Sequence, residues 1–363
     1  MSIPVRGGGT TVKTFVSSLM KTEQPMTLTR IAALAKTSPS TVSRVLSDDP
    51  RISEATRQRV LQILKENRYQ PNLLARALKG GKTGQIGVLA TNIGSGFFAE
   101  VLQGIDFATR AQAIHMVCSF AHGIADYIEM AADMLTNGRT DGLILIDPPL
   151  EMFDRKPPVG ATPAVLCASR PLRRSSDWHQ VDSVTVDNKD AMNQLVGHMA
   201  GRRRAYLIHL AGPRNTYDSQ ARRAAFKAAL RGRKGWRATI EDGHLIDGDG
   251  RRSAKQMLKC GHPLPDAILC FNDSTAQGVA ETFDAEGVAW RGRVAITGWD
   301  NSTAAHFMDL TSVQMPTHDL GRTSAELLLE RLKPNGPIAA PRQVALPTTV
   351  HFRGSTLYRG SKP

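Results

Sequence analysis

Eight short apolar segments between residues 86 and 299 constrain the fold of this chain more than any other feature. They lie at residues 86–90, 115–120, 142–146, 164–168, 183–187, 205–210, 267–272 and 294–299. Amphipathic stretches separate most of them, for example residues 98–112 and 188–200. Strands that alternate with helices predict parallel sheets joined by right-handed crossovers. This chain order holds too many strands for one compact sheet, so we expect two similar doubly wound subdomains with a ligand cleft between them.

The front of the chain carries a concentrated positive charge. The whole chain has a net charge of +13, of which +7 falls within residues 26–82 and only +4 within residues 83–363. A small basic module ahead of a near-neutral body is typical of a protein that binds a polyanion through one region. Basic residues that merely solvate a surface would be spread more evenly.

Residues 26–71 show the pattern of an all-α helix-turn-helix module. Three apolar stripes at helical spacing consist of Ile31, Leu34 and Ala35; Val42, Val45 and Leu46; and Val60, Ile63 and Leu64. Ser38 is a suitable N-cap for the second helix, with Pro39 at its first position. Ser53 is the expected cap of a third helix over residues 54–67. Two short helices joined by a tight turn and followed by a longer third helix match helix-turn-helix geometry.

The second of these helices presents small hydroxyl groups and one guanidinium opposite its apolar stripe. These residues are Ser40, Ser43 and Arg44, with Pro39 at the tip. An arginine can bind guanine O6 and N7 bidentately, with roughly 1–3 kcal/mol of discrimination between bases. An ordinary three-helix bundle with a polar outer face would show the same periodicity. The local charge favours DNA over that alternative.

Residues 81–83, Gly-Lys-Thr, end like a phosphate-binding P-loop. The motif requires glycine where this chain has Arg76, and it expects a strand before the loop and a helix after it. Here a helical stub precedes and an apolar strand follows. We therefore interpret the segment as a flexible joint whose lysines face DNA phosphates, not as a nucleotide site.

Patterns for catalysis, metal binding and cofactors are absent from the sequence. It has no GxSxG, HExxH or GxGxxG motif, and Cys260 with His262 lacks a second pair of ligands. The four cysteines are widely spread, no apolar run approaches the ~20 residues of a membrane span, and residues 1–25 lack the apolar core of a signal peptide. We expect a cytoplasmic protein without cofactor, metal or catalytic residues. A periplasmic-type binding protein without a DNA role is the first alternative, and an enzyme is the second.

Four short motifs follow one another between residues 41 and 78: T-V-S-R-V, S-x-x-T-R, Y-x-P-N and A-R-x-L. In this order and spacing they resemble the head of lactose-repressor (LacI/GalR-type) transcription factors. The resemblance implies that Pro39, Ser40 and Arg44 face base edges in the major groove. It implies phosphate contacts for Ser38, Thr41, Ser43 and Asn72. Lys36 stands where the family usually has glycine, at a cost on the order of 1 kcal/mol if this turn needs a positive φ.

In that family the segment corresponding to residues 73–78 is a hinge helix, which orders when two subunits meet over the minor groove of the operator. The resemblance puts Ala75 in the groove and Leu78 between the central base pairs, where it kinks the DNA. Packing of Leu73, Leu74 and Leu78 on the body is the alternative.

The resemblance extends over residues 26–350, and the body is similar to the periplasmic-sugar-binding-protein-like effector domain of the family. Its matching motifs include Ile86-Gly87, Phe97-Phe98, Asp141-Gly142, Val186-Asp187-Asn188, Gly212-Pro213, Asn272-Asp273, Gly298-Trp299-Asp300-Asn301 and Leu320-Gly321. The resemblance implies that Phe97 stacks on a ligand. It implies that Asp147, Asn272 and Asp300, at strand ends, bind a hydroxyl-rich effector. Turn and cap chemistry is the alternative for each of these polar residues.

Several positions in the body depart from the family pattern. Gln220 stands where many members have an arginine that clamps the ligand, Ala168 replaces an aspartate, Leu245 an aromatic residue and Met315 a glutamine. Loss of a bidentate guanidinium weakens the case for a simple hexose. Arg170 is the candidate replacement for that charge. We expect a sugar or sugar-derivative effector, with acidic derivatives among the candidates.

The expected organisation is a disordered extension over residues 1–25, a head over 26–71, a hinge and linker over 72–83, a body over 84–350 and a tail over 351–363. The body divides into residues 84–182 with 313–345, and residues 183–312. The tail has no heptad repeat, so a tetramerising helix is not indicated. The implied function is repression by a homodimer whose heads bind the half-sites of a pseudo-palindromic operator under effector control.

Overall fold

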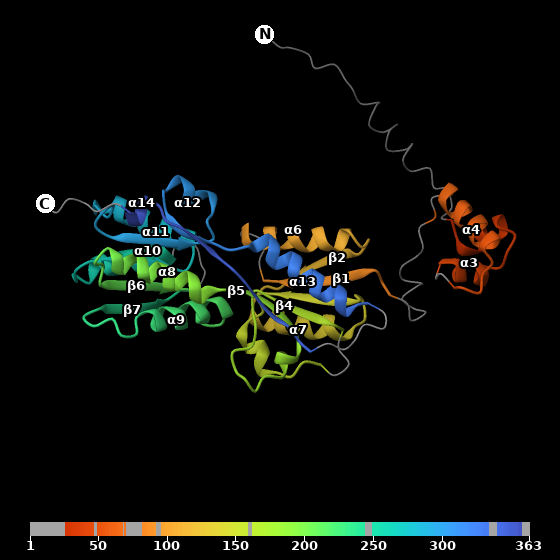
Figure 1. The fold of residues 1–363 in the computed structure, drawn as a ribbon, viewed down its shortest axis with the longest axis horizontal. Coiled ribbons are helices and arrows are strands. Elements are labelled where there is room, and N and C mark those ends of the chain that lie inside the picture. Colours follow the sequence, from red (N-terminus) through yellow and green to blue (C-terminus); the bar gives the residue numbers. More distant parts are fainter. Residues whose placement is uncertain are drawn as a thin grey trace, which may run out of the picture. The chain divides into compact units, whose positions relative to one another are not determined.

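The computed structural model describes residues 26–46, 49–67, 69, 82–91, 96–158, 162–243, 249–333 and 340–357. The chain divides into two compact units, one within the first 81 residues and one from Lys82 onward (Figure 1). Each unit encloses its own apolar core.

The front unit is a helical module, as predicted. Its helices are α2 (Leu28–Leu34), α3 (Pro39–Leu46) and α4 (Glu54–Glu66). Ile31, Val42 and Val60 are fully buried between them. Leu34 is half exposed, so its predicted place in the buried stripe of the first helix is wrong. Leu34 is the last residue of α2, and its side chain lies on the side of the helix away from the small core.

Local chemistry explains where the second helix begins. The Ser38 hydroxyl accepts a hydrogen bond from the Thr41 backbone N–H at 3.1 Å, and Pro39 takes the first helical position. Lys36 in the preceding turn has a φ of 48°. The turn therefore does require the left-handed backbone conformation that glycine adopts at lowest cost.

The first sheet of the body is parallel throughout, with strand order β11-β5-β4-β3-β1-β2. Its strands are β1 (Gln85–Ala90), β2 (His115–Phe120), β3 (Gly142–Ile146), β4 (Ala164–Cys167), β5 (Asp182–Val186) and β11 (Gln343–Leu346). Helices α6 (Gly96–Arg110) and α13 (Thr317–Arg331) cover one face, and α7 (Ile124–Thr136) covers the other (Figure 1). Gly104 and Gly321 let α6 and α13 touch, because a Cβ at either position would lie 1.9 Å from a backbone oxygen of the other helix.

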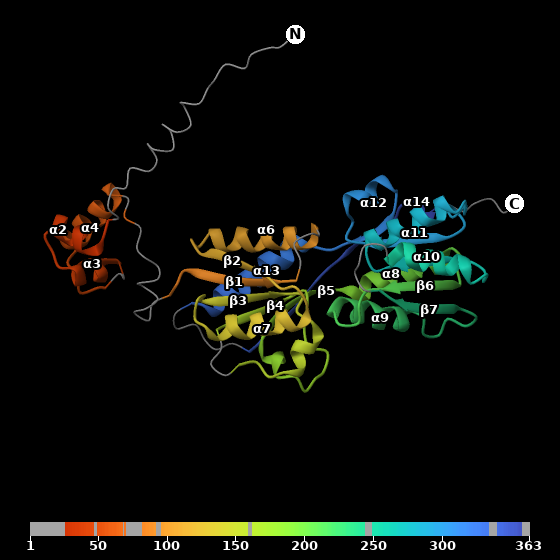
Figure 2. The same ribbon diagram turned by 180° about the vertical axis from the view of Figure 1, so that it is seen from behind.

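The second sheet has the order β12-β10-β9-β8-β6-β7, and only β12 runs antiparallel to its neighbour. Its strands are β6 (Tyr206–Ala211), β7 (Arg237–Asp242), β8 (Ala267–Cys270), β9 (Ala295–Trp299), β10 (Thr311–Gln314) and β12 (Thr349–His351). The pairs α8 (Asn188–Gly201) with α9 (Tyr217–Ala229), and α10 (Asp249–Lys259) with α11 (Asp273–Ala285), pack together on the sheet (Figure 2). Shorter helices are α12 (Thr303–Phe307), α14 (Gly354–Leu357), η1 (Leu150–Asp154) and η2 (Asp177–Gln180).

The predicted fold class is confirmed, but the sheets move two of the expected boundaries. The chain passes between sheets after β5, after β10 and after β11. Residues 183–186 therefore belong to the first subdomain and residues 313–314 to the second, the reverse of the expectation. The expected tail from residue 351 is also wrong in part, because α14 packs on the second sheet and the Ser355 hydroxyl donates to the Ile296 carbonyl at 2.7 Å. The eight predicted segments omitted β7, β10, β11 and β12, which are short or carry exposed polar residues.

Candidate functional sites

The candidate nucleic-acid interface is the first turn and outer face of α3. Ser38, Pro39, Ser40 and Arg44 are exposed, while Thr41 and Ser43 are half-buried. The Ser38 hydroxyl oxygen lies 2.7 Å from that of Ser40 and 2.9 Å from that of Thr41, so three hydroxyl groups form one hydrogen-bonded set. The N-terminal end of a helix with free polar groups is suited to phosphates, and an exposed guanidinium is suited to base edges.

The three other predicted DNA contacts, Asn72, Ala75 and Leu78, lie outside the described residues. Their roles stay predictions.

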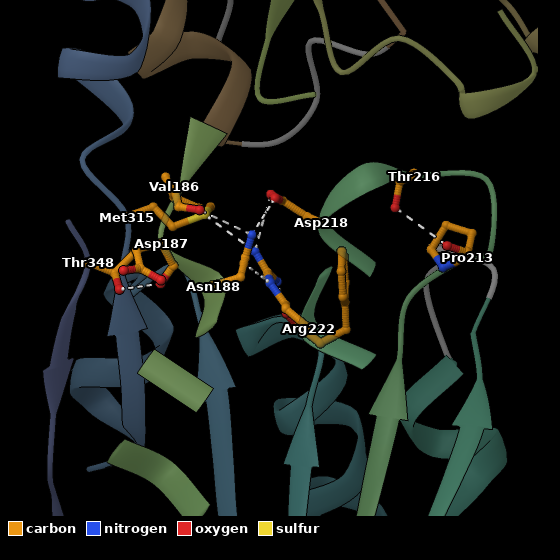
Figure 3. Close-up of polar contacts among 10 residues, drawn as sticks. Val186, Asp187, Asn188, Pro213, Thr216, Asp218, Arg222, Met315 and Thr348 are labelled. Carbon is orange, nitrogen blue, oxygen red and sulfur yellow. Dashed lines mark hydrogen bonds and ion pairs between the residues drawn. The ribbon is translucent and has the colours of Figure 1, made fainter. Parts of the chain in front are cut away.

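The candidate ligand site is a cluster around Arg222, where polar groups from several elements meet (Figure 3). Its Nε donates to Asn188 Oδ1 at 2.9 Å, and its Nη1 donates to the Phe271 carbonyl at 2.8 Å. Its Nη2 lies 3.4 Å from Asp218 Oδ2 and 3.4 Å from the Met315 sulfur. Arg222 is only 2% exposed. The side chain is therefore a fixed cation in the body of the protein.

Two aromatic rings complete the setting of Arg222. The guanidinium carbon lies 3.9 Å from the centroid of the Trp299 ring and 4.6 Å from that of the Phe271 ring. Trp299 is the last residue of β9 and Phe271 directly follows β8, both in the second sheet. Such stacking favours arginine over lysine, because the planar guanidinium presents its face to the rings while its edges donate hydrogen bonds.

Carboxyl groups from both subdomains act electrostatically on this cation, and Asp218 contacts it directly. Burial raises the pKa of Asp147 to about 7, and Asp218 raises it further while Arg222 opposes the shift. Burial likewise raises the pKa of Asp300 to about 8, although water reaches this side chain, and Arg222 again acts in the opposite sense. The pKa of Asp218 is also raised by burial. Several carboxyl groups thus interact with one guanidinium. A site of this kind favours a ligand that forms hydrogen bonds over a ligand that adds negative charge.

Strand ends supply two of these carboxyl groups, as predicted. Asp147 directly follows β3 and Asp300 directly follows β9. Both have a positive φ, 44° for Asp147 and 106° for Asp300. Backbone strain of this kind often occurs at functional sites. The two residues come from different sheets. Burial lowers the pKa of Arg222, and both of them act to raise it. Carboxyl groups from both sheets thus act on this cation, which makes the space beside Arg222 the candidate ligand crevice.

The remaining predicted ligand contacts are placed differently. Phe97 is half-buried and packs edge-on against Phe98, with ring centroids 5.1 Å apart. The side chain of Asn272 accepts from the Thr275 backbone N–H at 2.8 Å and caps α11, which is the cap chemistry considered as the alternative. Arg170 does not contact the Arg222 cluster. Its Nε donates to the Tyr217 hydroxyl at 3.1 Å and its Nη1 to Gln343 Oε1 at 2.8 Å.

The supposed loss of the clamping arginine is corrected by the register of α9. Gln220 points away from the cluster and donates to the Arg214 carbonyl at 2.7 Å. Arg222 occupies the inward face instead, four residues before the buried Phe226. Counting helical turns back from Phe226 would have identified it, because residues four apart lie on one face. Leu245, the other loosely aligned departure, lies outside the described residues.

Asp141 anchors the start of the body at the end of the linker. Its Oδ1 accepts from the Thr83 backbone N–H at 2.7 Å and from the Thr83 hydroxyl at 2.9 Å, and its Oδ2 accepts from the Gly84 N–H at 2.9 Å. Lys82 donates to the Leu332 carbonyl, at the C-terminal end of α13. The first residues of the body are thereby tied to β3 and to α13.

Among the described residues, no group of three His, Cys, Asp or Glu side chains is arranged to hold a metal ion. None of the described helices combines the length and apolarity that a membrane crossing requires.

Comparison with protein families gives two matches along the chain. Residues 27–72 match the model of bacterial regulatory proteins of the lacI family, and residues 196–356 match that of a periplasmic binding protein-like domain. The first match covers the helical unit. The second covers most of the second subdomain and the returning segment of the first.

Curated relatives match over nearly their full length. The ribose operon repressor of Escherichia coli (strain K12) is 29% identical over 344 residues, which cover 91% of this chain and 99% of the relative. The HTH-type transcriptional repressor PurR of Vibrio atlanticus (strain LGP32) is 27% identical over 327 residues, covering 85% and 92%.

Solved structures share the fold. The lac repressor dimer bound to operator and the anti-inducer ONPF superposes with a TM-score of 0.77 at 24% identity, covering 92% of this chain and all of that one. A complex of the transcriptional regulator CelR with cellobiose gives a TM-score of 0.66 at 25% identity, covering 91% and 99%.

Proposed function

The chain belongs to the lacI family of bacterial regulatory proteins, and from that premise we propose how this repressor recognises its operator and what kind of ligand it senses. It is a ligand-responsive DNA-binding regulator and not an enzyme, since its curated relatives are repressors. Access to operator DNA makes the cytoplasm its site of action in this proposal.

We propose that α3 enters the major groove of the operator. Pro39, Ser40 and Arg44 face base edges, and Ser38, Thr41 and Ser43 contact phosphates. The exposure of the first group and the hydrogen-bonded hydroxyl groups at the helix start support this assignment. One head covers only a half-site, so two copies of the chain bind a pseudo-palindrome as a homodimer.

The hinge segment supplies the second part of this operator contact. Asn72 contacts the backbone, Ala75 lies in the minor groove and Leu78 separates the central base steps. Insertion of an apolar side chain unstacks DNA and bends it, and the energy that this requires depends on sequence. Paired hinge segments therefore add specificity at base pairs that the heads do not touch.

The effector binds in the crevice beside Arg222, and we propose a neutral, hydroxyl-rich molecule such as a sugar or an uncharged sugar derivative. Asp147 and Asp300 form hydrogen bonds with hydroxyl groups of the ligand, and Phe97 packs on the apolar face of its ring. Arg222 holds the neighbouring polar side chains in place. The observation that carries this assignment is the excess of carboxyl groups over cations around Arg222. An acidic sugar is disfavoured there, because the raised pKa values of these carboxyl groups show that the site already disfavours negative charge. The crevice thus favours hydroxyl groups over the acidic derivatives considered at first.

Helix α13 connects this crevice to the linker. Thr317, at its start, donates to Glu100, whose charge affects Asp300, and the Leu332 carbonyl just beyond its end accepts from Lys82. A ligand that binds one arrangement of the subdomains more tightly shifts α13 and the anchored linker with it. The change in operator affinity equals the difference in effector affinity between the two arrangements.

Two measurements test the proposed function. Genomic footprinting of the protein should give pseudo-palindromic sites, whose neighbouring genes indicate the effector. Calorimetric titration should then give binding of a neutral sugar such as ribose or cellobiose, with adenine as a non-sugar control and glucuronate as an acidic one. Footprints without half-site symmetry would overturn the DNA assignment. Binding of glucuronate or adenine alone would overturn the effector assignment.

A further inference from the structure

A second cavity lies beside the crevice, at the place where the chain passes between the subdomains. It has a volume of about 240 Å³. Its walls include Thr185 and Val344 of the first sheet, and Lys189 and Tyr217 of the second subdomain. We call this cavity the lateral pocket.

Two cations line the lateral pocket, and neither has an ion pair with a described carboxylate. Within the described parts of the chain, Arg170 hydrogen-bonds to the neutral oxygens of Tyr217 and Gln343 and to no others. Its guanidinium carbon lies 5.6 Å from the centroid of the Tyr217 ring. Lys189 is exposed at the start of α8. Many other arginines of the body, such as Arg173 and Arg331, do have carboxylate partners. The charge of the lateral pocket therefore has no partner within the described parts of the chain.

Arg170 is held in a fixed position with donors to spare. A guanidinium has five N–H groups, and the contacts to Tyr217 and Gln343 use one on Nε and one on Nη1. Both N–H groups of Nη2 and the second one of Nη1 have no partner among the described residues, so they can bind a ligand. A planar pair of donors matches the oxygens of a carboxylate or a phosphate.

The pocket and the crevice have opposite electrostatic character. Arg222 directs its donors to protein groups and interacts electrostatically with three carboxyl groups, whereas the side chains of Arg170 and Lys189 form no ion pair with a described carboxylate. Asp187 is the acidic residue of the pocket wall. Its carboxylate is occupied with the Lys189 and Asp190 backbone N–H groups at the start of α8, so it caps the helix.

We propose that the lateral pocket binds a small anionic metabolite through a phosphate or carboxylate group held by Arg170 and Lys189. The volume is below the ~300–1,000 Å³ of pockets for drug-sized ligands, so the molecule is smaller than a nucleotide. Because both subdomains line the pocket, the anion binds one arrangement of the subdomains better than the other and acts as a second input to the regulator. The pocket shares Asn188 with the Arg222 cluster, but its cations, Arg170 and Lys189, are different residues.

Calorimetric titration of the full chain with glycerol 3-phosphate tests this proposal, with D-glycerate as the carboxylate probe and glycerol as the neutral one. Binding of either anion, without binding of glycerol, is expected. Arg170→Gln and Lys189→Gln should each weaken it about tenfold, the effect of losing one charge-assisted contact. Arg173→Gln is the matched control. This exposed arginine is close to Arg170 in the sequence, pairs with Asp154 and does not line the pocket.

The outcomes separate this site from the sugar site. Asp300→Asn should reduce sugar binding and leave anion binding unchanged, so failure of one assignment does not affect the other. Equal weakening of anion binding by Arg170→Gln and Arg173→Gln would overturn the assignment of the lateral pocket as the anion site. So would the absence of binding by both anions at dissociation constants below about 1 mM.

Discussion

The guanidinium of Arg222 lies against the ring of Trp299, with 3.9 Å between the guanidinium carbon and the ring centroid. The contact joins α9 to the end of β9, directly before Asp300. It places the cation of the candidate effector site on the second sheet, while Asp147 approaches from the first sheet. The arrangement of the two sheets therefore changes the electrostatic environment of both residues.

Replacement of Arg222 should affect both stability and ligand binding. Arg222→Met should lower the free energy of unfolding by about 3 kcal/mol, because Asp218 and Asn188 lose a buried partner. All four tryptophans lie in the body, so urea unfolding followed by their fluorescence reports on this unit. Gln220→Met is the control and should change stability by less than about 0.5 kcal/mol. Equal losses in the two variants would contradict the role assigned to Arg222.

The raised pKa of Asp147, about 7 in the folded protein, predicts a pH dependence of stability. Between pH 4 and pH 7 the folded state holds a proton that the unfolded state releases, so the contribution of this group to stability falls as the pH rises. Asp147→Asn cannot titrate. The stability of this variant relative to the wild type should rise by about 2 kcal/mol from pH 5 to pH 8, allowing for water in the crevice. Urea unfolding curves at four pH values measure it, and a constant difference would contradict the prediction.

Removal of Arg44 should change which bases the protein prefers. Arg44→Ala should relax the preference at one base pair in each half-site, with a cost of about 1–3 kcal/mol on the preferred sequence. Arg59→Ala, on the exposed face of α4, removes the same charge elsewhere in the head. That control should weaken all sequences about equally. A binding assay on a library of randomised operators compares them, and identical profiles for Arg44→Ala and the wild type would exclude a direct base contact.

Leu78 should matter for specific binding far more than for nonspecific binding. Leu78→Ala removes the side chain proposed to separate the central base steps. Its loss should weaken the complex with kinked operator DNA, whereas a complex with straight nonspecific DNA does not use this side chain. A gel-shift series with operator and random DNA, at fixed salt, compares the two losses. Equal weakening on both DNAs would exclude the wedge.

Local sequence patterns alone were enough to predict several parts of this protein. The helices of the head and the N-cap at Ser38 depend on neighbouring residues. The family resemblance drew attention to Lys36, whose turn has a positive φ. The central strands are continuous apolar runs because both of their faces are buried. Asp147 and Asp300 were named through the family resemblance, and the sequence pattern added only that each directly follows an apolar strand.

The tertiary structure decided what sequence spacing could not. Helical spacing could have placed Arg222 rather than Gln220 on the buried face of α9, but only the fold shows that it meets Asn188, Phe271 and Trp299. Arg170 lines the lateral pocket and not the candidate effector site, because it contacts Tyr217 and Gln343 from distant parts of the chain. The short edge strand β11 and the antiparallel strand β12 form only by pairing with strands far away in sequence. Local pattern determines an element, whereas long-range contacts determine which side chains meet.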